Sequence, residues 1–386
     1  MKRADAPAAR EAGTRRHGYL RVVAVLLALI AVLNFAALVP GFADSYVACA
    51  YPALTLPLAR LSELFALPVG ELVMYGGIAA LVAGLVLAVL ALFLHRRRAF
   101  ARAVGVYWKS VLSVVLVVGL LFTLNWAIPF RATPLRAVYG AGADASLEQL
   151  EALRNRIVVG LDQAASECPR DEAGQVACGD GLDARVAAAL DGAGDEFARL
   201  EGHYPAPKAA LCSDVLEWMG IGGYTYPYTQ EVTYNRYVSR LYYPVLSAHE
   251  LVHHRGYFME DDAEFLSFFA LSRSDDALLR YSAYEHLYYY VEGAYEARLV
   301  DGLGQDGARA RHEAQPQVSA QVRDDVAYDG QEREQRYAGS VNGTLEGLFA
   351  QPAQDVSRAG WDTQAQVLQE NAYDGVVGLL LAYYGG

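Results

Sequence analysis

Residues 249–253 form an HExxH motif, in which His249 and His253 flank Glu250. Two histidines four positions apart lie on one face of a helix, so their rings can share one metal ion, and zinc is the usual ion. Zinc held by three protein ligands leaves a fourth position for water. Glu250 can accept a proton from this water, and the hydroxide then attacks a carbonyl group. The motif therefore predicts peptide hydrolysis with one Zn²⁺ ion as cofactor and Glu250 as general base.

A third ligand is expected from the segment that follows. Gly256 favours a helix end, because glycine accepts the left-handed conformation, and Glu260 begins a second helical pattern. In zincins with a glutamate as third ligand, that residue often lies in the pattern ExxAD or ExxAN, and residues 260–264 are similar to it. We expect Glu260 to bind the metal and Glu264 to orient a ligand histidine. Asp262 and Glu264 stay open as alternative ligands.

The segment before the motif predicts one or two strands. Residues 222–235 are rich in β-branched and aromatic residues, and Pro227 favours an edge position. An edge strand ahead of the metal helix can bind an extended peptide as an added strand, with Tyr224, Tyr226 and Tyr228 as candidate contacts. A purely structural hairpin is the alternative.

A tyrosine-rich helix is predicted at residues 277–300. One of its tyrosines, or His286, is a candidate to stabilise the oxyanion of the reaction. Packing of the tyrosine rings in the core is the alternative explanation of this composition.

The N-terminal third predicts three transmembrane helices. Uncharged apolar runs at about residues 22–43, 72–94 and 110–130 are long enough to cross a bilayer. Residues 1–21 and the loop between the second and third runs are basic, whereas the loop between the first two runs carries little charge. Positive loops favour the cytoplasm, so we predict a cytoplasmic tail at 1–21, a membrane region at 22–131 and an extracytoplasmic domain at 132–386.

Charge and cysteine content agree with this placement. The formal net charge is −12 although the membrane region is basic, so the C-terminal domain is strongly acidic. Such a domain is a poor partner for nucleic acid. Cys168 and Cys178 bracket a polar loop, where a disulfide is allowed in an oxidising compartment, and four reduced thiols are the alternative.

Three segments of the chain resemble the bacterial membrane proteins of domain-of-unknown-function family 3810. Residues 222–231 are similar to its Gly-x-x-x-Phe-Pro-Phe-Thr-Gly-Glu segment, and residues 248–265 to its AHELAHQRG motif with the following EDEANF. Residues 372–384 are similar to its SYxxVVxLLLAYY tail. If the first glutamate of EDEANF is the ligand, Glu260 preserves it, whereas the second corresponds to Asp262.

The resemblance implies a zincin-like putative metallopeptidase of the bacterial inner membrane. The expected fold has three N-terminal transmembrane α-helices and a mainly α (α+β) extracytoplasmic domain with a small sheet and an edge strand. The expected partners are the lipid bilayer and a peptide or protein substrate in the envelope. The alternative function is a non-catalytic envelope scaffold or binding protein with a degenerate or structural metal site. Glu250 separates the two, because a structural site needs no carboxylate there.

Overall fold

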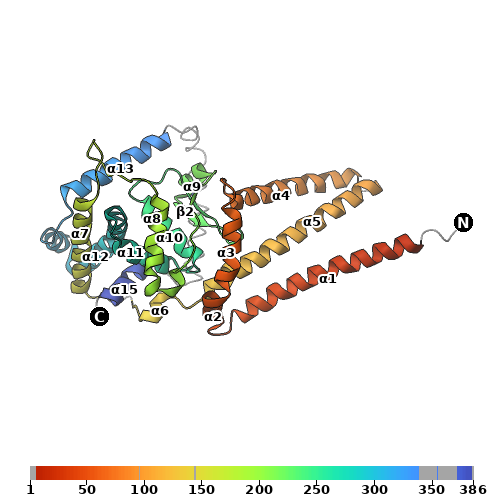
Figure 1. Cartoon of the computed structure of the whole chain (residues 1–386), viewed down its shortest axis with the longest axis horizontal. Helices are drawn as coiled ribbons and strands as arrows, with labels where there is room; N and C mark the ends of the chain where they lie inside the picture. Colours follow the sequence, from red (N-terminus) through yellow and green to blue (C-terminus); the bar gives the residue numbers. More distant parts are fainter. Residues whose placement is uncertain (1–5, 95, 143–144, 339–353, 355–371, 385–386) are drawn as a thin grey trace. The chain divides into compact units, whose positions relative to one another are not determined.

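The chain is mostly helical and contains a small sheet (Figure 1). The structure, a computed structural model, describes residues 6–94, 96–142, 145–338, 354 and 372–384. It divides into two compact units. Unit 1 comprises residues 1–55, 69–132 and 227–229, and unit 2 comprises residues 56–68, 133–226 and 230–386.

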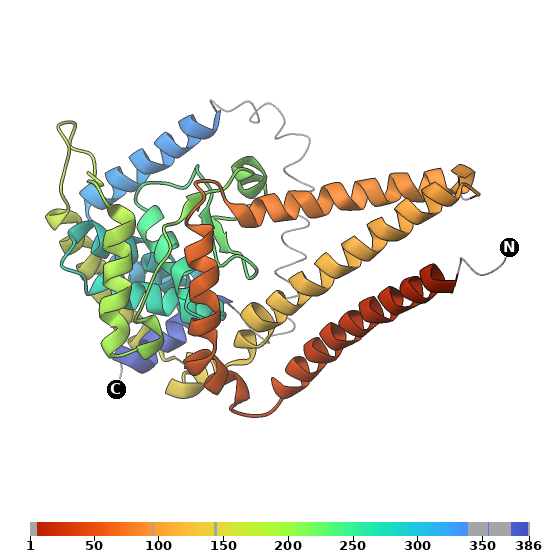
Figure 2. The same ribbon diagram turned by 45° about the vertical axis from the view of Figure 1, so that its right-hand side comes forward.

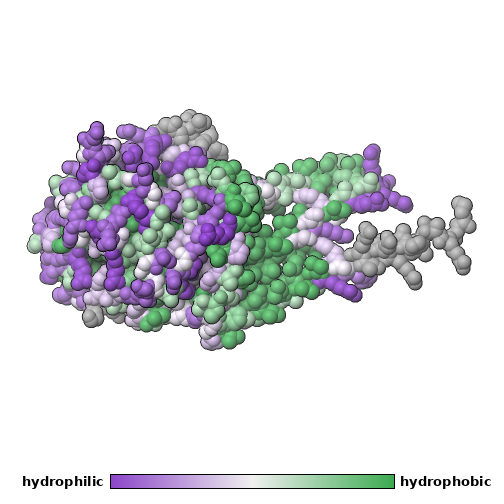
Figure 3. Space-filling model, in the orientation of Figure 1, coloured by the Kyte–Doolittle hydropathy of each residue, from purple (hydrophilic) through white to green (hydrophobic). Residues whose placement is uncertain are grey.

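Unit 1 holds long apolar helices. Its elements are α1 (Ala6–Ala36), α2 (Phe42–Cys49), the start of α3 (Tyr51–Ser62), α4 (Val69–Leu94), α5 (Arg98–Phe122), the π-helical turn η1 (Thr123–Ala127) and the 3₁₀ turn η2 (Pro129–Arg131). The helical stretches His17–Ala36, Val69–Leu94 and Arg98–Tyr139 are long and apolar enough to cross a membrane. Apolar side chains cover these helices, and polar ones gather where α4 joins α5 (Figure 3). The three predicted membrane helices are therefore present, as expected of a membrane protein.

The bounds of the first membrane helix differ from the prediction. α1 ends at Ala36, whereas the apolar run of the sequence continues to residue 43. Pro40 cannot donate a helical hydrogen bond, and Gly41 has a φ of +76°, so the chain turns here before α2 begins. The length of an apolar run therefore overestimates the length of the helix when a proline and a glycine end the helix earlier.

Unit 2 is built from helices packed around one core. Its helices are α6 (Leu135–Tyr139), α7 (Leu147–Glu167), α8 (Leu182–Gly192), α9 (Ser213–Met219), α10 (Tyr243–His254), α11 (Glu260–Ser272), α12 (Ala277–Glu313), α13 (Ala320–Ala338) and α15 (Ala372–Tyr384), with 3₁₀ turns η3 (Ala193–Asp195) and η4 (Ala198–Leu200). Side chains of α7, α8, α10, α11, α12 and α15 meet in one apolar cluster. Ser146 caps α7 through a capping box with Gln149, which satisfies two free backbone donors.

The sheet has three short strands and lies against α10. β1 (Lys208–Ala209) runs parallel to β3 (Val232–Tyr234), and β2 (Gly223–Thr225) pairs antiparallel with β3, with Tyr224 opposite Thr233. The order β1-β3-β2 places β2 at an edge. The small sheet with an edge strand before the HExxH helix is thus present as predicted.

Two helices in the middle of unit 2 carry the motif residues. α10 starts with Pro244 in its first turn, and Gly256, with a φ of +87°, ends the helical path as predicted. α11 begins at Glu260 and packs against both α10 and α12 (Figures 1 and 2). The tight turn between α10 and α11 therefore brings the histidine-bearing end of α10 close to the acidic first turn of α11.

Candidate metal centre

Three side chains converge where α10 ends and α11 begins. The Nε2 atoms of His249 and His253 lie 3.0 Å apart, and Glu260 Oε2 lies 3.1 Å from His249 Nε2 and 3.6 Å from His253 Nε2. We call these three atoms the donor triangle. His253 is 8 % exposed, and the other two side chains are half-buried. The structure thus brings together the two motif histidines and the glutamate expected as third ligand.

The donor triangle has the dimensions that a zinc ion requires. Bonds of about 2.0–2.1 Å in tetrahedral geometry place ligand atoms roughly 3.3 Å apart. The three observed separations, 3.0, 3.1 and 3.6 Å, lie around this value. Two imidazole nitrogens and one carboxylate oxygen are also a ligand set that zinc uses in hydrolytic enzymes. The residues therefore fit one zinc ion with a fourth position open.

The second nitrogen of each histidine is held by an acceptor. His253 Nδ1 lies 2.7 Å from the carbonyl oxygen of Tyr257, and His249 Nδ1 lies 3.4 Å from Glu264 Oε1. Such contacts fix the ring orientation and leave Nε2 free for a metal. Glu264 therefore has the position expected of a residue that orients a ligand histidine.

Glu264 is itself held from the tyrosine-rich helix α12. His286 Nε2 lies 2.9 Å from Glu264 Oε2, and the Tyr290 hydroxyl donates to Glu264 Oε1 at 3.1 Å. Both oxygens of the carboxylate are therefore engaged. His286, a candidate for oxyanion stabilisation from the sequence, is here a partner of Glu264.

The turn after α10 is fixed by Arg199. Its guanidinium lies 3.5 Å from the centre of the Tyr257 ring and donates to the carbonyl of Gly256 at 3.2 Å. Gly256 has a left-handed conformation that other residues rarely adopt. These contacts hold the Tyr257 carbonyl where His253 needs an acceptor.

Glu250 lies beside the donor triangle and contacts strand β2. It is 5 % exposed, and its Oε2 lies 3.1 Å from the Thr225 hydroxyl. Burial raises the pKa of Glu250, although the two histidines oppose the shift. A carboxylate of raised basicity is suited to accept a proton near neutral pH. Gly223 makes room for it, since a Cβ at this position would lie 3.3 Å from Glu250 Oε1 and 2.6 Å from the Thr233 carbonyl oxygen.

The charges of the site are strongly coupled. Burial opposes a charge on His249, but Glu264 and Glu260 outweigh it and raise the pKa of His249 well above its usual value. Burial likewise opposes a charge on His253, and Glu260 raises its pKa. The pKa values of Glu260 and Glu264 are lowered by the histidines in spite of burial. The glutamates therefore favour protonation of the histidines, and the histidines favour ionisation of the glutamates.

Zinc binding is therefore expected to release protons. Zinc takes neutral imidazole, so it competes with protons whose binding to His249 and His253 the raised pKa values favour. Raising the pH from about 6 to about 8 should increase zinc affinity, by up to about tenfold per pH unit for each proton released. Calorimetric titration in buffers of different ionisation enthalpy measures the released protons. Equal zinc affinity at both pH values would contradict this coupling.

Asp262 points away from the donor triangle. It is 2 % exposed, and its Oδ1 accepts a hydrogen bond from the backbone N–H of Leu135 at 2.9 Å. Burial and the neighbouring Asp261 raise the pKa of Asp262 to about 7. Asp261 faces Arg136 at 3.8 Å. The geometry thus favours Glu260 over Asp262 as third ligand.

The candidate substrate tyrosines occupy different places. The hydroxyls of Tyr224 and Tyr226 are hydrogen-bonded to each other, and only Tyr224 lies within β2. Tyr228 belongs to unit 1, where its hydroxyl donates to the Gly70 carbonyl at 3.1 Å. The hairpin tyrosines therefore do not form one continuous row along the edge strand.

A family model covers most of the chain, from residue 46 to residue 381. The chain belongs to the DUF3810 family. The family is described as protein of unknown function. No curated protein and no solved structure matches the chain.

Three contacts of the candidate site in this DUF3810 protein are not predicted by its sequence. Thr225 holds the Glu250 carboxylate, Tyr257 orients His253 through its backbone carbonyl, and Tyr290 binds Glu264. A backbone carbonyl carries no signal in the sequence. Thr225 gives a weak one, because it lies in the strand predicted just before the metal helix.

The DUF3810 chain contains a second group of metal-binding side chain types. Glu292, Glu296 and His312 place one donor atom each within 4.8 Å of the others. Arg154, which is fully buried, donates to Glu292 at 2.7 Å. A guanidinium already neutralises this carboxylate, so the group is better explained as a structural ion-pair network that joins α7 to α12.

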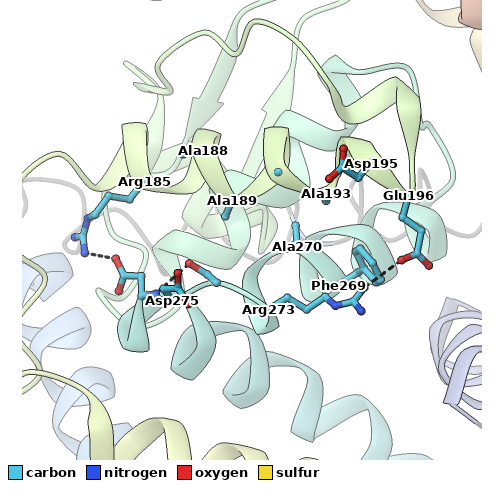
Figure 4. A pocket seen from close by; sticks show the side chains of 13 residues that line it. Arg185, Ala188, Ala189, Ala193, Asp195, Glu196, Phe269, Ala270, Arg273 and Asp275 are labelled. Carbon is cyan, nitrogen blue, oxygen red and sulfur yellow. Dashed lines mark hydrogen bonds and ion pairs between the residues drawn. The ribbon is translucent and has the colours of Figure 1, made fainter.

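A cavity of about 600 Å³ lies away from these residues, between α8 and the end of α11 (Figure 4). Arg185 is paired there with Asp276, and Arg273 with Glu196. None of the predicted site residues lines it. Because both arginines already have carboxylate partners, this cavity offers no free cation to an anionic ligand.

None of the four cysteines forms a disulfide in the structure. Cys168 is buried and Cys178 is half-buried, and both contact the same apolar cluster. The structure contains no Cys168–Cys178 disulfide.

Proposed function

We propose that this chain is a membrane-anchored zinc-dependent metallopeptidase with a zincin-like domain. His249, His253 and Glu260 are the proposed ligands of one zinc ion, and Glu250 is the proposed general base. The observation that carries the proposal is the donor triangle, whose sides match those of a tetrahedral zinc site. The contacts of both Nδ1 atoms support it, because they leave the Nε2 atoms available to the metal.

The residues around the triangle have complementary tasks. A bound zinc ion supplies an acidified water and polarises the carbonyl of the substrate. Glu250 accepts the proton of the water and passes it to the leaving nitrogen. The Thr225 hydroxyl lies 2.9 Å from the backbone carbonyl of Glu250 and 3.1 Å from its carboxylate, and it positions both. Strand β2 lies at the edge of the sheet beside α10, where an extended peptide can pair with its free side.

The proposed location is the bacterial inner membrane with the site outside the cytoplasm. The basic residues of the N-terminal segment and of the α4–α5 connection favour the cytoplasm for both. With three crossings, the proposed site lies on the envelope side of the membrane. The proposed substrate is a peptide or protein of the envelope.

The test is metal content and peptide cleavage of the full chain purified in detergent. We expect about one zinc per chain by mass spectrometry of the metal. Cleavage of a proteome-derived peptide mixture should stop when a chelator removes the metal and return when zinc is added.

A matched pair of variants locates the ion. His253→Ala should lose the zinc and His312→Gln should keep it, because His312 belongs to the second carboxylate–histidine group. Zinc lost with His312→Gln alone would contradict the assigned site. A chain that binds zinc at His253 but cleaves nothing would support the non-catalytic scaffold instead.

A further inference from the structure

A second cavity, of about 370 Å³, lies within unit 2, and its wall includes His286, the partner of Glu264. It is formed by residues of α9, α12 and α13, by the segments on both sides of the hairpin, and by Tyr242, which directly precedes α10. Its wall includes Glu217, Gly222, Tyr242, Glu285, His286 and Arg333. Its volume is in the range of ligand pockets, about 300–1,000 Å³, and it is large enough for one long side chain.

Two residues connect this cavity with the metal centre. Tyr242 lies on the helical path seven residues before His249, which is about two turns. Its ring lies 5.1 Å from that of His286, measured between centroids. His286 contacts Glu264, which in turn faces His249. Gly222, also in the wall, directly precedes the edge strand β2. A peptide paired with β2 would therefore pass the cavity.

The wall carries charged groups of both signs. Arg333 is paired with Glu217, and His286 is paired with Glu264. Glu285 makes no ion pair with a lysine or an arginine among the described residues, and it has a hydrogen bond with Tyr289. Burial raises the pKa of Glu285 to about 7. Glu285 is half-buried, and a carboxyl group that burial disfavours as an anion gains from a cation that enters the cavity.

We propose that this cavity binds a lysine or arginine side chain of the substrate close to the cleaved bond, with Glu285 as the partner of its charge. The Tyr242 ring can cover the aliphatic part of such a side chain. This inference rests on the proposed peptidase function and specifies its substrate class, namely peptides with a basic residue beside the cut.

Cleavage-site sequencing of a peptide mixture digested by the full-length protein in detergent tests the inference. Lysine and arginine should be enriched at one position beside the cut. Two peptides that differ at this position, with arginine or glutamine, then give a ratio of kcat/KM values. Glu285→Gln should lower this ratio about tenfold, because it removes a charge-assisted hydrogen bond. Arg333→Gln should raise it, because it removes the positive charge of the wall.

Asp301→Asn is the matched control, because it neutralises an exposed carboxylate elsewhere on α12, and its ratio should equal that of the wild type. Zinc content and the thermal unfolding midpoint establish that each variant is folded. Cleavage with enrichment of aromatic or acidic residues, or a ratio unchanged by Glu285→Gln, would overturn the inference and leave the peptidase function intact. A zinc-loaded wild-type protein that cleaves no peptide would overturn both.

Discussion

Replacing Glu250 with glutamine should abolish peptide cleavage and leave the zinc ion bound. The amide has nearly the shape of the carboxylate and can keep the contact with Thr225, but it cannot accept a proton from water. General-base catalysis contributes about 10²–10⁴-fold to rate, so we expect kcat to fall by at least about a hundredfold. Glu250 is not a corner of the donor triangle, and zinc content should therefore stay near one per chain.

The measurement combines single-turnover cleavage with metal analysis of the same preparation. Glu172→Gln provides the control, because it makes the same chemical change at an exposed loop residue. Loss of zinc together with activity would assign Glu250 to metal binding. Activity within a few-fold of wild type would remove it as the base and weaken the enzyme proposal.

The sequence predicts the parts of the site whose geometry is local. His249 and His253 are one helical turn apart, so their common face follows from helix geometry alone. Gly256 ends the helix because its φ of +87° suits glycine. The three membrane helices are likewise determined by composition over about 20 residues. Local geometry and composition are therefore enough to predict these elements from the sequence.

The third ligand could not be decided in this way. Glu260, Asp261 and Asp262 all lie in the first turn of α11, and successive residues point about 100° apart. Which one faces the histidines depends on the turn after Gly256 and on the direction of α11. Leu135, the partner of Asp262, is 127 positions away in sequence. The hydrogen bond from Leu135 that directs Asp262 away from the histidines therefore cannot be predicted from a local sequence pattern.

The surroundings of the site are non-local as well. His286 and Glu264 lie 22 positions apart, and Thr225 and Glu250 lie 25 apart. The tyrosine-rich composition of α12 is more often a sign of core packing, and catalysis was the less common alternative. The packing of α12 against α11 directs His286 and Tyr290 to Glu264. Tertiary packing therefore determines their roles.

Replacing Glu260 with glutamine should reduce zinc affinity strongly, whereas replacing Asp262 with asparagine should leave it unchanged. Structural sites with four protein ligands bind zinc with about 10–16 kcal/mol, so the loss of one of the three ligands here should weaken binding at least about a hundredfold. Asp262 keeps a hydrogen bond acceptor for Leu135 when it becomes an amide. Its pKa of about 7 means that the side chain is already partly neutral at pH 7, so asparagine is a close mimic.

The two variants form a matched pair, because each converts one acid of the same helical turn into its amide. Zinc affinity is measured by competition with a chromophoric chelator at constant pH, and the unfolding midpoint of the metal-free protein shows whether either variant is misfolded. If Asp262→Asn loses the metal and Glu260→Gln keeps it, Asp262 is the ligand and α11 must turn relative to α10 on binding. If only Glu260→Gln loses it, the donor triangle is the metal site, since the two carboxylates differ chiefly in which one faces His249 and His253.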